Sequence, residues 1–552
     1  MSENTSSDQS ATEVPAADPA ADPAAEKPAA ESPPAATSTP ELEAIKQGYT
    51  FDEPAIELGA LMEADQPHPE IGVRIPLGML NRHGLIAGAT GTGKTVTLQL
   101  LTEQISAAGV PVVAADVKGD LSGLASPGAA SEKLTKRTEK IGQQWEPKAA
   151  PTQFFALGGK GIGVPLRATV SSFGPVLLSK VLGLNETQEQ SLGLVFHYAD
   201  TAGLPLLDLS DLQSLMNFLT SDEGKPELKN IGGLSTATAG VILRSITTFA
   251  AEGADQFFGE PEFDTADLLQ VGEDGRGVVS LVELPTLASQ PSLFSTFLMW
   301  LLADLFQDLP EVGDSDKPKL VFFFDEAHLL FNDASKAFLD SITQTVRLIR
   351  SKGVGVFFVT QTPKDVPDDV LAQLGSRVQH QLRAHTPNDA KALKQTVATY
   401  PKSHYDLGAV LQELGIGEAV VTVMDPDGAP TPVAWTRMRA PQSLMAPTPE
   451  AEMKAAVDGS PLMAKYGEEI DRESAREMLA KRLEDGAEHA AGEQKAGEAP
   501  APQQQPAEPK GRQKKEKSFF EQVSSNTMVR QIGRTAVREV MRGLFGTGRR
   551  RR

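Results

Sequence analysis

The chain of 552 residues contains no cysteine. This absence excludes disulfide frameworks, zinc ribbons, iron–sulfur ligation and thiol catalysis, and it suits a reducing cytosol. Long apolar runs are also missing. The strongest one, Phe297 to Phe306, spans ten residues and already contains Asp304, whereas a membrane helix needs about 18 or more. The first residues show neither a basic segment nor an apolar stretch, so we expect a cytoplasmic protein without a secretory signal or an integral membrane segment.

Basic residues are in the minority: 52 Lys and Arg stand against 73 Asp and Glu, which gives a formal net charge of −21. Because phosphate binding rests on Lys and Arg, this balance argues against a protein that coats nucleic acid. The deficit is uneven along the chain. Residues 510–552 carry thirteen Lys and Arg and three Glu, so they hold a charge of +10 and the rest of the chain holds −31. Contact with a polyanion must therefore be local.

Composition divides the chain into several segments. Short β-branched runs alternate with amphipathic helical stretches through the middle of the chain, which is typical of an α/β fold built on a mainly parallel sheet. Both ends are rich in residues that cannot bury apolar surface. The predicted organisation is a disordered acidic Ala/Pro-rich tail (1–42), a folded α/β core (43–440) with a helical insertion (about 121–270), a helical extension (441–489), a linker (490–509) and a disordered basic tail (510–552).

One segment decides the class of chemistry. From Gly88 the sequence reads G-A-T-G-T-G-K-T, a complete G-x-x-x-x-G-K-T motif. It follows a short apolar run and opens a helical pattern, so its backbone N–H groups can surround phosphate oxygens at a helix N-terminus. We expect Lys94 to reach the β- and γ-phosphates of ATP and Thr95 to ligate Mg²⁺. The predicted nucleotide-binding residues are Gly88, Ala89, Thr90, Gly91, Thr92, Gly93, Lys94 and Thr95.

Hydrolysis requires an acidic residue near the metal and a base for water. The apolar run at 320–324 predicts a buried strand, and Asp325 and Glu326 follow it directly. In open α/β sheets, ligands bind at the carboxyl ends of the strands. We therefore assign Asp325 to the Mg²⁺ shell and Glu326 to the general base that activates the attacking water.

Two further strand ends carry polar residues. Gln361 follows the predicted strand Val354 to Thr360, where its amide could sense the γ-phosphate, although a strand-end Gln can also simply cap a turn. Asp116 and Lys118 follow the strand Val110 to Ala115. They are candidates for groups that orient the residues in contact with the nucleotide.

A predicted helix at 335–352 bears Arg347 and Arg350 just before Gly353. An arginine at this point could complete the site of a neighbouring subunit and neutralise charge in the transition state. The alternative is the commoner one for a helical arginine, a solvated or ion-paired side chain.

Taken together, the GATGTGKT loop, the DVKGD segment, the VFFFDEAH strand and the RSKGVGVFFVTQTP segment resemble the HerA/FtsK group of P-loop ATPases. The run Asp368 to Lys394 is most similar to the bacterial HerA-like proteins of the YjgR type. This resemblance implies a RecA-like core, a homo-hexameric ring that binds ATP between subunits, and double-stranded DNA in the pore. It also implies catalytic roles for Lys94, Glu326 and Gln361. The best match to the arginine that acts in trans is Arg350, and the other candidates are Arg347, Arg377 and Arg383.

Three functions remain open from the sequence. The first is an ATP-driven DNA translocase or helicase, with a nuclease or another protein as a possible partner. The second is an ATPase ring that remodels or moves proteins, which suits the charge of −31 outside the basic tail. The third is a nucleotide-gated scaffold with slow turnover.

The basic tail has a pattern of its own. Arg530, Arg534, Arg538 and Arg542 recur every four residues beside an apolar stripe. Like charges at this spacing repel one another on a helix, so the row favours an anionic partner. DNA phosphates, an anionic membrane surface and the acidic part of the same chain all fit this description. The remaining alternative is an unbound, solvated tail.

Overall fold

The computed structural model describes residues 40–485, apart from 230, 231, 288, 314, 333 and 335. The predicted acidic tail up to residue 39, the linker at 490–509 and the basic tail at 510–552 lie outside the described residues, and so do the four regularly spaced arginines of that tail.

Twelve strands form one sheet in the order β2-β1-β12-β11-β10-β3-β9-β8-β4-β7-β5-β6. The strands are β1 (Ala55–Glu63), β2 (Gln66–Pro76), β3 (Gly84–Ala87), β4 (Val112–Asp116), β5 (Thr152–Leu157), β6 (Val164–Leu166), β7 (Val279–Glu283), β8 (Leu320–Phe324), β9 (Val354–Thr360), β10 (Ser376–Gln379), β11 (Glu418–Thr422) and β12 (Ala434–Met438).

Every neighbouring pair from β10 to β6 is parallel, and the pairs from β2 to β10 are antiparallel. Parallel strands read as continuous apolar runs because helices cover both of their faces, and β8 and β9 are buried throughout. The structure therefore confirms the predicted α/β class with a mainly parallel sheet.

The α-helices connect and cover these strands. They are α1 (Pro40–Gly48), α2 (Lys94–Ala107), α3 (Glu132–Lys140), α4 (Val170–Val181), α5 (Glu186–Ala202), α6 (Leu209–Thr220), α7 (Lys225–Leu228), α8 (Thr236–Ala251), α9 (Pro291–Asp308), α10 (His328–Phe331), α11 (Lys336–Ile349), α12 (Asp368–Leu371), α13 (Pro387–Ala398), α14 (Leu407–Glu413), α15 (Glu450–Asp458) and α16 (Pro461–Tyr466). Short 3₁₀ turns lie at Leu77–Arg82, Leu121–Ala125, Ala254–Phe257, Thr265–Leu269, Pro285–Leu287, Arg350–Lys352 and Pro363–Asp365.

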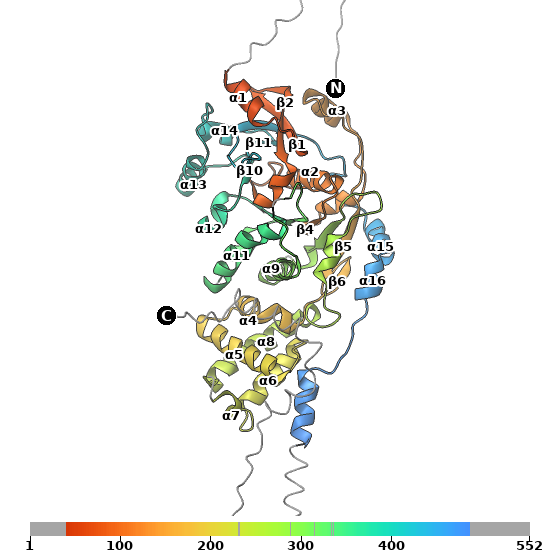
Figure 1. Cartoon of the computed structure of the whole chain (residues 1–552), viewed down its shortest axis with the longest axis vertical. Helices are drawn as coiled ribbons and strands as arrows, with labels where there is room; N and C mark the ends of the chain where they lie inside the picture. The colour runs from red at the N-terminus through yellow and green to blue at the C-terminus, as the bar shows by residue number, and fades with distance from the viewer. Residues whose placement is uncertain are drawn as a thin grey trace, which may run out of the picture.

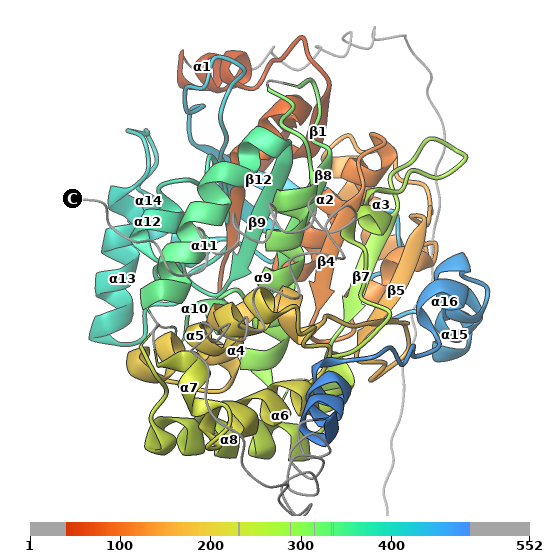
Figure 2. The same cartoon turned by 60° about the horizontal axis from the view of Figure 1, so that its bottom comes forward.

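The crossover connections place helices on opposite faces of the sheet. The chain passes from β3 through α2 to β4, and it returns towards β3 through α9 and α11. Because such crossovers are right-handed, α2 covers one face and α9 and α11 cover the other. In Figure 2, α9 and α11 lie in front of the strands. This arrangement brings the carboxyl ends of β3, β9, β8 and β4 to one edge.

Within the stretch predicted as a helical insertion, the structure has two strands of the main sheet, β5 and β6, and then the helices α4 to α8. These helices form a separate layer at the lower end of the molecule in Figure 1. Polar side chains cap the N-termini of α4, α5, α6 and α8; Asn185 of α5, for example, accepts the backbone N–H of Gln188, as helix starts generally require. Phe173 of α4 contacts Phe297 of α9, with ring centroids 6.1 Å apart, so this layer packs on the core through α4.

The last described segment runs along the β5–β6 edge of the sheet. Helices α15 and α16 lie beside these strands (Figure 1), and residues 475–485 are again helical. Over the residues that the structure describes, none of the helices combines the length and the apolar character that crossing a bilayer demands.

Candidate functional site

The glycine-rich loop follows β3 and adopts a conformation that depends on its glycines. Gly88, Gly91 and Gly93 have positive φ angles of 158°, 81° and 114°, of which Gly91 and Gly93 are clearly in the region that favours glycine. A Cβ atom built on Gly91 would meet no other atom within 4 Å. Glycine is therefore favoured at this point by the positive φ angle and not by a lack of space.

Helix α2 begins at Lys94, and its N-cap residue Gly93 offers no side chain to the first turn. The first backbone N–H groups of a helix have no partner within the helix, and they attract anions. The Lys94 Nζ donates to the carbonyl oxygens of Gly88 at 2.7 Å and Ala89 at 3.3 Å. Burial lowers the pKa of Lys94 below its ordinary value, against the opposing effect of the nearby carboxylates. The ammonium group is thus held inside the loop by backbone oxygens.

A buried histidine that the sequence did not identify as a site residue lies next to the glycine-rich loop and contacts helix α2. His380 follows β10; its Nε2 lies 3.0 Å from the hydroxyl of Thr97, and its Nδ1 lies 2.8 Å from the carbonyl oxygen of Glu418. Burial, with the positive charge of Lys94, lowers the pKa of His380 to about 4. The imidazole is therefore neutral at pH 7, with Nδ1–H donating to Glu418 and Nε2 accepting from Thr97.

Asp325 and Glu326 emerge together at the end of β8. Glu326 has a φ of 48°, a strained value for a residue other than glycine that is typical of functional sites. Its backbone N–H donates to Oδ1 of Asp325 at 2.9 Å. Burial and the charge of Glu326 raise the pKa of Asp325 to about 7, so a cation beside this carboxyl group would favour its charged form.

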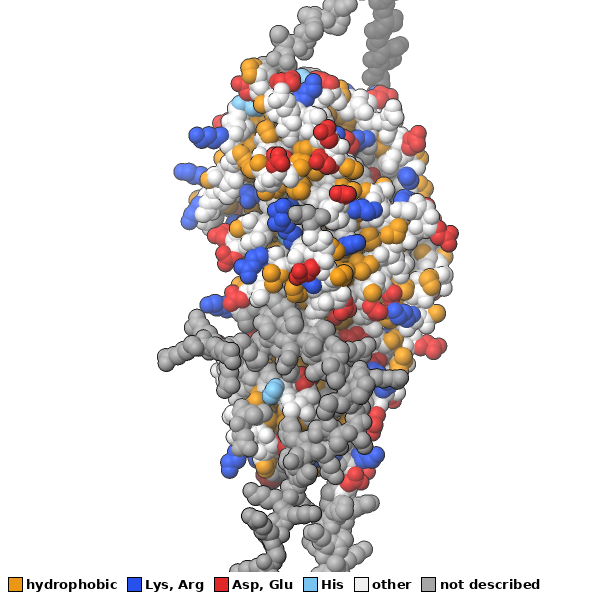
Figure 3. Space-filling model, viewed as in Figure 1, with side chains coloured by type: hydrophobic (Ala, Val, Ile, Leu, Met, Phe, Trp, Pro, Cys, Tyr) orange, Lys and Arg blue, Asp and Glu red, His pale blue; other side chains and the backbone are white. Residues whose placement is uncertain are grey.

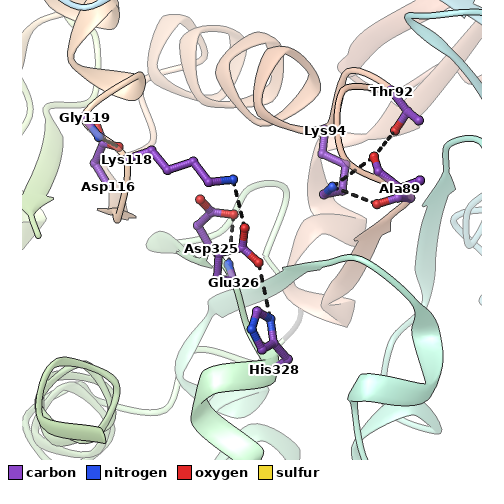
Figure 4. Close-up of polar contacts among 10 residues, drawn as sticks. Ala89, Thr92, Lys94, Asp116, Lys118, Gly119, Asp325, Glu326 and His328 are labelled. Atoms are coloured by element: carbon purple, nitrogen blue, oxygen red, sulfur yellow. Dashed lines mark hydrogen bonds and ion pairs between the residues drawn. The ribbon is translucent and has the colours of Figure 1, made fainter. Parts of the chain in front are cut away.

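The side chain of Glu326 is held by a lysine from a neighbouring strand end. Lys118 Nζ lies 2.9 Å from Oε1 of Glu326, and Nδ1 of His328 lies 3.3 Å from its Oε2. Burial alone would raise the pKa of Glu326, but the hydrogen bond and charge of Lys118 reverse this and lower it. In Figure 4, Lys118 approaches the two carboxylates from one side, and Lys94 lies on the other side in the glycine-rich loop.

Asp116 holds the loop that carries Lys118. Its Oδ1 accepts the N–H of Gly119 at 2.7 Å, and its Oδ2 accepts those of Leu121 at 2.8 Å and Ser122 at 3.1 Å. Burial, with the charge of Asp120, raises the pKa of Asp116 to about 6 despite these three hydrogen bonds. Asp116 therefore acts on the candidate site through the position of Lys118 rather than by contact.

Gln361 is exposed at the end of β9, the strand between β3 and β8. Thr360, the residue before Gln361, accepts the N–H of Gly88 through its carbonyl oxygen at 3.2 Å. The structure thus brings Gln361 to the same edge as the glycine-rich loop and the two carboxylates, where the sequence predicts it.

The arginine candidates occupy different parts of the fold. Arg350 precedes β9, whose seven residues extend about 23 Å, so it lies at the opposite edge of the sheet from Gln361. Its charge adds to burial in lowering the pKa of His83 to about 4. Arg347 is exposed in the last turn of α11.

Arg377 and Arg383 are on the β10 side. Arg377 Nη1 donates to the hydroxyl of Thr399 at 2.7 Å. Arg383 Nη2 donates to the carbonyl oxygen of Thr90 at 3.3 Å. Arg383 therefore contacts the glycine-rich loop of its own chain, a neighbour that its position 289 residues after Lys94 gave no reason to expect.

The residues at this edge fit a nucleotide with Mg²⁺. Oε2 of Glu326 is buried and, beside its 3.3 Å approach to Nδ1 of His328, makes no hydrogen bond with any described residue, so it can still accept from a water molecule. The described residues include no group of three or more side chains that would hold a metal ion by themselves. Mg²⁺ usually takes one or two protein ligands and completes its shell with phosphate and water. Thr95 and Asp325 are the two residues that would hold it.

Comparison with known proteins gives a family match and distant relatives. The family model described as "Helicase HerA-like C-terminal" matches residues 61–552. The DNA double-strand break repair helicases HerA of Sulfurisphaera tokodaii and Saccharolobus solfataricus are each 22% identical to the chain, over 398 and 400 residues. These matches cover 71% and 70% of both chains. Among solved structures, the bacterial conjugative coupling protein TrwBdeltaN70 matches with a TM-score of 0.48 and 14% identity, over 74% of this chain and 94% of that one.

Proposed function

The chain belongs to the helicase HerA-like C-terminal family of P-loop ATPases, and from its site we propose that it is a Mg²⁺-dependent ATPase that works as a homo-hexameric motor on double-stranded DNA. The observation that carries the hydrolytic part is the Glu326 carboxylate: one oxygen is held by Lys118, and the other, 3.3 Å from Nδ1 of His328, is buried and makes no hydrogen bond among the described residues. A carboxylate in this state is prepared to accept a proton from water.

The residues at the sheet edge have separate tasks in this proposal. Lys94 leaves the carbonyl oxygens of its own loop and binds the β- and γ-phosphates, while Gln361 contacts the γ-phosphate from β9. Thr95 and Asp325 would hold Mg²⁺, which would supply positive charge to the phosphates. Water attacks the γ-phosphorus and transfers a proton to Glu326, and the bond from this phosphorus to the β–γ bridging oxygen breaks to release ADP.

Assembly is supported by the place of Arg350. This residue lies at the edge of the sheet opposite to Glu326, about the length of β9 away, so within one chain it is out of reach of the γ-phosphate. In a ring, the corresponding edge of one subunit can face the nucleotide edge of the next. We infer that Arg350 acts in trans, as arginine fingers do.

DNA as the moved polymer is supported by the family and by the names of the two curated relatives. Figure 3 shows Lys and Arg side chains interspersed with Asp and Glu on the face in view. A surface of this kind does not attract DNA broadly, which agrees with contact confined to a pore. The predicted segments at 1–42, 43–440, 441–489, 490–509 and 510–552 remain our proposal for the domain organisation.

A ring that moves polypeptide is the second candidate, favoured by the charge of −31 outside residues 510–552. Mass measurement with ATP, with and without duplex DNA, separates the candidates. The DNA motor predicts a hexamer mass that increases by the mass of one duplex when DNA is added. A hexamer that never retains DNA would favour the polypeptide motor, and a monomer under all conditions would contradict both.

A further inference from the structure

The order of the strands determines which end of a bound nucleotide lies on which side of β3. On one side of β3 lie β9 and β8, which lead to Gln361 and Glu326; on the other side lie β10 and β11. If ATP binds as proposed above, its γ-phosphate is on the Glu326 side, and its base extends towards β10 and β11. Strand β11 runs antiparallel to β10, so its first residue, Glu418, lies at the same sheet edge as the glycine-rich loop.

The turn at residues 414–418, which leads into β11, is fixed against the glycine-rich loop. The N–H of Gly417 donates to the carbonyl oxygen of Thr92 at 3.0 Å. A Cβ atom on Gly93 would lie 3.3 Å from Cα of Gly417. Arg137 Nη2 donates to the carbonyl oxygen of Gly417 at 2.8 Å. The turn is therefore an extension of the loop that holds the phosphates.

The buried carboxylate of Glu418 also fixes the conformation of this turn. Glu418 is 5% exposed, and its Oε2 accepts the N–H of Gly415 at 3.0 Å and Nε1 of Trp435 at 3.1 Å. Its Oε1 accepts Nη2 of Arg437 at 2.6 Å. A surface fixed in this way loses little conformational freedom when a ligand packs on it.

One apolar side chain stands out from this rigid turn. Ile416 is 77% exposed, the largest value among the exposed large hydrophobic residues of the described part of the chain. Nucleotide and cofactor sites are lined mainly by apolar groups, with a few polar groups that fix orientation. We propose that Ile416 forms one wall of the base subsite and packs against the purine face of ATP.

The proposal rests on the nucleotide site described above, and its test separates the base from the phosphates. The affinities of ATP and of inorganic tripolyphosphate, which has the phosphate chain but no base, are measured for the wild type, for Ile416→Ser and for Ile416→Leu. In Ile416→Ser, ATP binding should weaken about tenfold, while tripolyphosphate binding should change less than about twofold. Ile416→Leu should retain wild-type affinity for both. Val271→Ser is the matched control, since Val271 is 52% exposed next to the start of β7, at the other edge of the sheet.

Unchanged ATP affinity in Ile416→Ser would overturn the proposal, and so would an equal loss for ATP and tripolyphosphate, because the residue would then act on the phosphate loop. A variant that alters subunit assembly without altering ATP affinity would also overturn it and would place a neighbouring copy on Ile416. Failure of the proposed function looks different: the wild type would bind neither ligand, or Lys94→Ala would bind both as well as the wild type does.

Discussion

Lys118 and Glu326 are 208 residues apart in the chain, yet Nζ of the lysine lies 2.9 Å from Oε1 of the glutamate. The lysine is about half exposed and the glutamate is nearly buried, with side-chain exposures of 51% and 11%. This pair joins the ends of β4 and β8 at the point where we place the attacking water. The other carboxylate oxygen, Oε2, lies 3.3 Å from Nδ1 of His328 and is the atom that can take up a proton from water.

Replacing the proposed base should separate binding from turnover. In Glu326→Gln the amide oxygen can still accept from Lys118, but the side chain cannot accept a proton. We expect ATP affinity to remain within a few fold and the rate of phosphate release to fall about a thousandfold. Binding of a fluorescent ATP analogue and single-turnover phosphate release measure the two effects.

Glu283→Gln is the control for this variant. Glu283 is a buried carboxyl group at the end of β7, and burial, with the charges of Asp116 and Asp120, raises its pKa to about 8. It is therefore mostly neutral at pH 7, as glutamine is, and turnover should change little. Full activity in Glu326→Gln would mean that another group activates the water.

Removing the lysine of the ion pair should change the pH dependence of hydrolysis. Lys118 lowers the pKa of Glu326, whereas burial raises it. In Lys118→Met the pKa of Glu326 should rise, and because the base works only when charged, the acid limb of the pH–rate profile should move to higher pH. Lys136→Met removes a lysine from an exposed ion pair with Glu132 and should leave the profile in place. An unmoved acid limb in Lys118→Met would show that the pair does not control the base.

An arginine that acts in trans can be detected by mixing subunits. Arg350→Ala and Glu326→Gln should each be inactive as pure assemblies. In mixed rings, Arg350 of one subunit can meet Glu326 of another, so phosphate release should partly return. Arg347→Ala, an exposed residue on the adjoining turn of helix, should keep its activity alone. Absence of rescue in rings that are shown to be mixed would leave Arg350 with a structural role only.

His380 should make stability depend on pH. Its pKa is about 4 in the folded protein against an ordinary value of 6.5, so the unfolded chain binds the proton more readily. The neutral imidazole therefore contributes its full share to the free energy of unfolding above about pH 6.5, and this contribution is lost as the pH falls towards 4. His380→Phe also leaves Thr97 and the Glu418 carbonyl without their partner, at a cost of about 2 kcal/mol.

Thermal unfolding of the wild type and His380→Phe from pH 4 to 8 measures this effect. The wild type should unfold at the higher temperature at pH 8, and the difference should shrink as the solution becomes acidic. His83 titrates in both proteins, so its contribution cancels in the comparison. A difference that stays constant with pH would mean that His380 is not held in the neutral form.

Local patterns were sufficient to predict much of the fold. The apolar run before Asp325 gives β8, the run before Gln361 gives β9, and the end of the glycine-rich motif gives the start of α2. Each of these features depends on residues close together in the sequence. The two strands β5 and β6 inside the stretch expected to be helical show the limit, since short apolar runs fit a buried strand or a helix equally well.

Contacts between distant segments could not be predicted in the same way. Asp325, Glu326 and Gln361 could be placed near Lys94 because each follows a predicted parallel strand. The carboxyl ends of such strands lie at the same edge of the sheet. The partner of Glu326 depends on how the loop held by Asp116 is folded. The ion pair between Lys118 and Glu326 therefore cannot be predicted from the periodicity of the sequence.

We propose that this site hydrolyses ATP to drive movement on DNA. The rate of phosphate release from ATP, measured with and without duplex DNA, tests it most directly, with Lys94→Ala as the inactive control. The proposed motor should hydrolyse ATP several-fold faster when DNA is present, and Lys94→Ala should show no activity in either condition. A wild-type protein that binds ATP and hydrolyses it at the same rate whether or not DNA is added would contradict the claim.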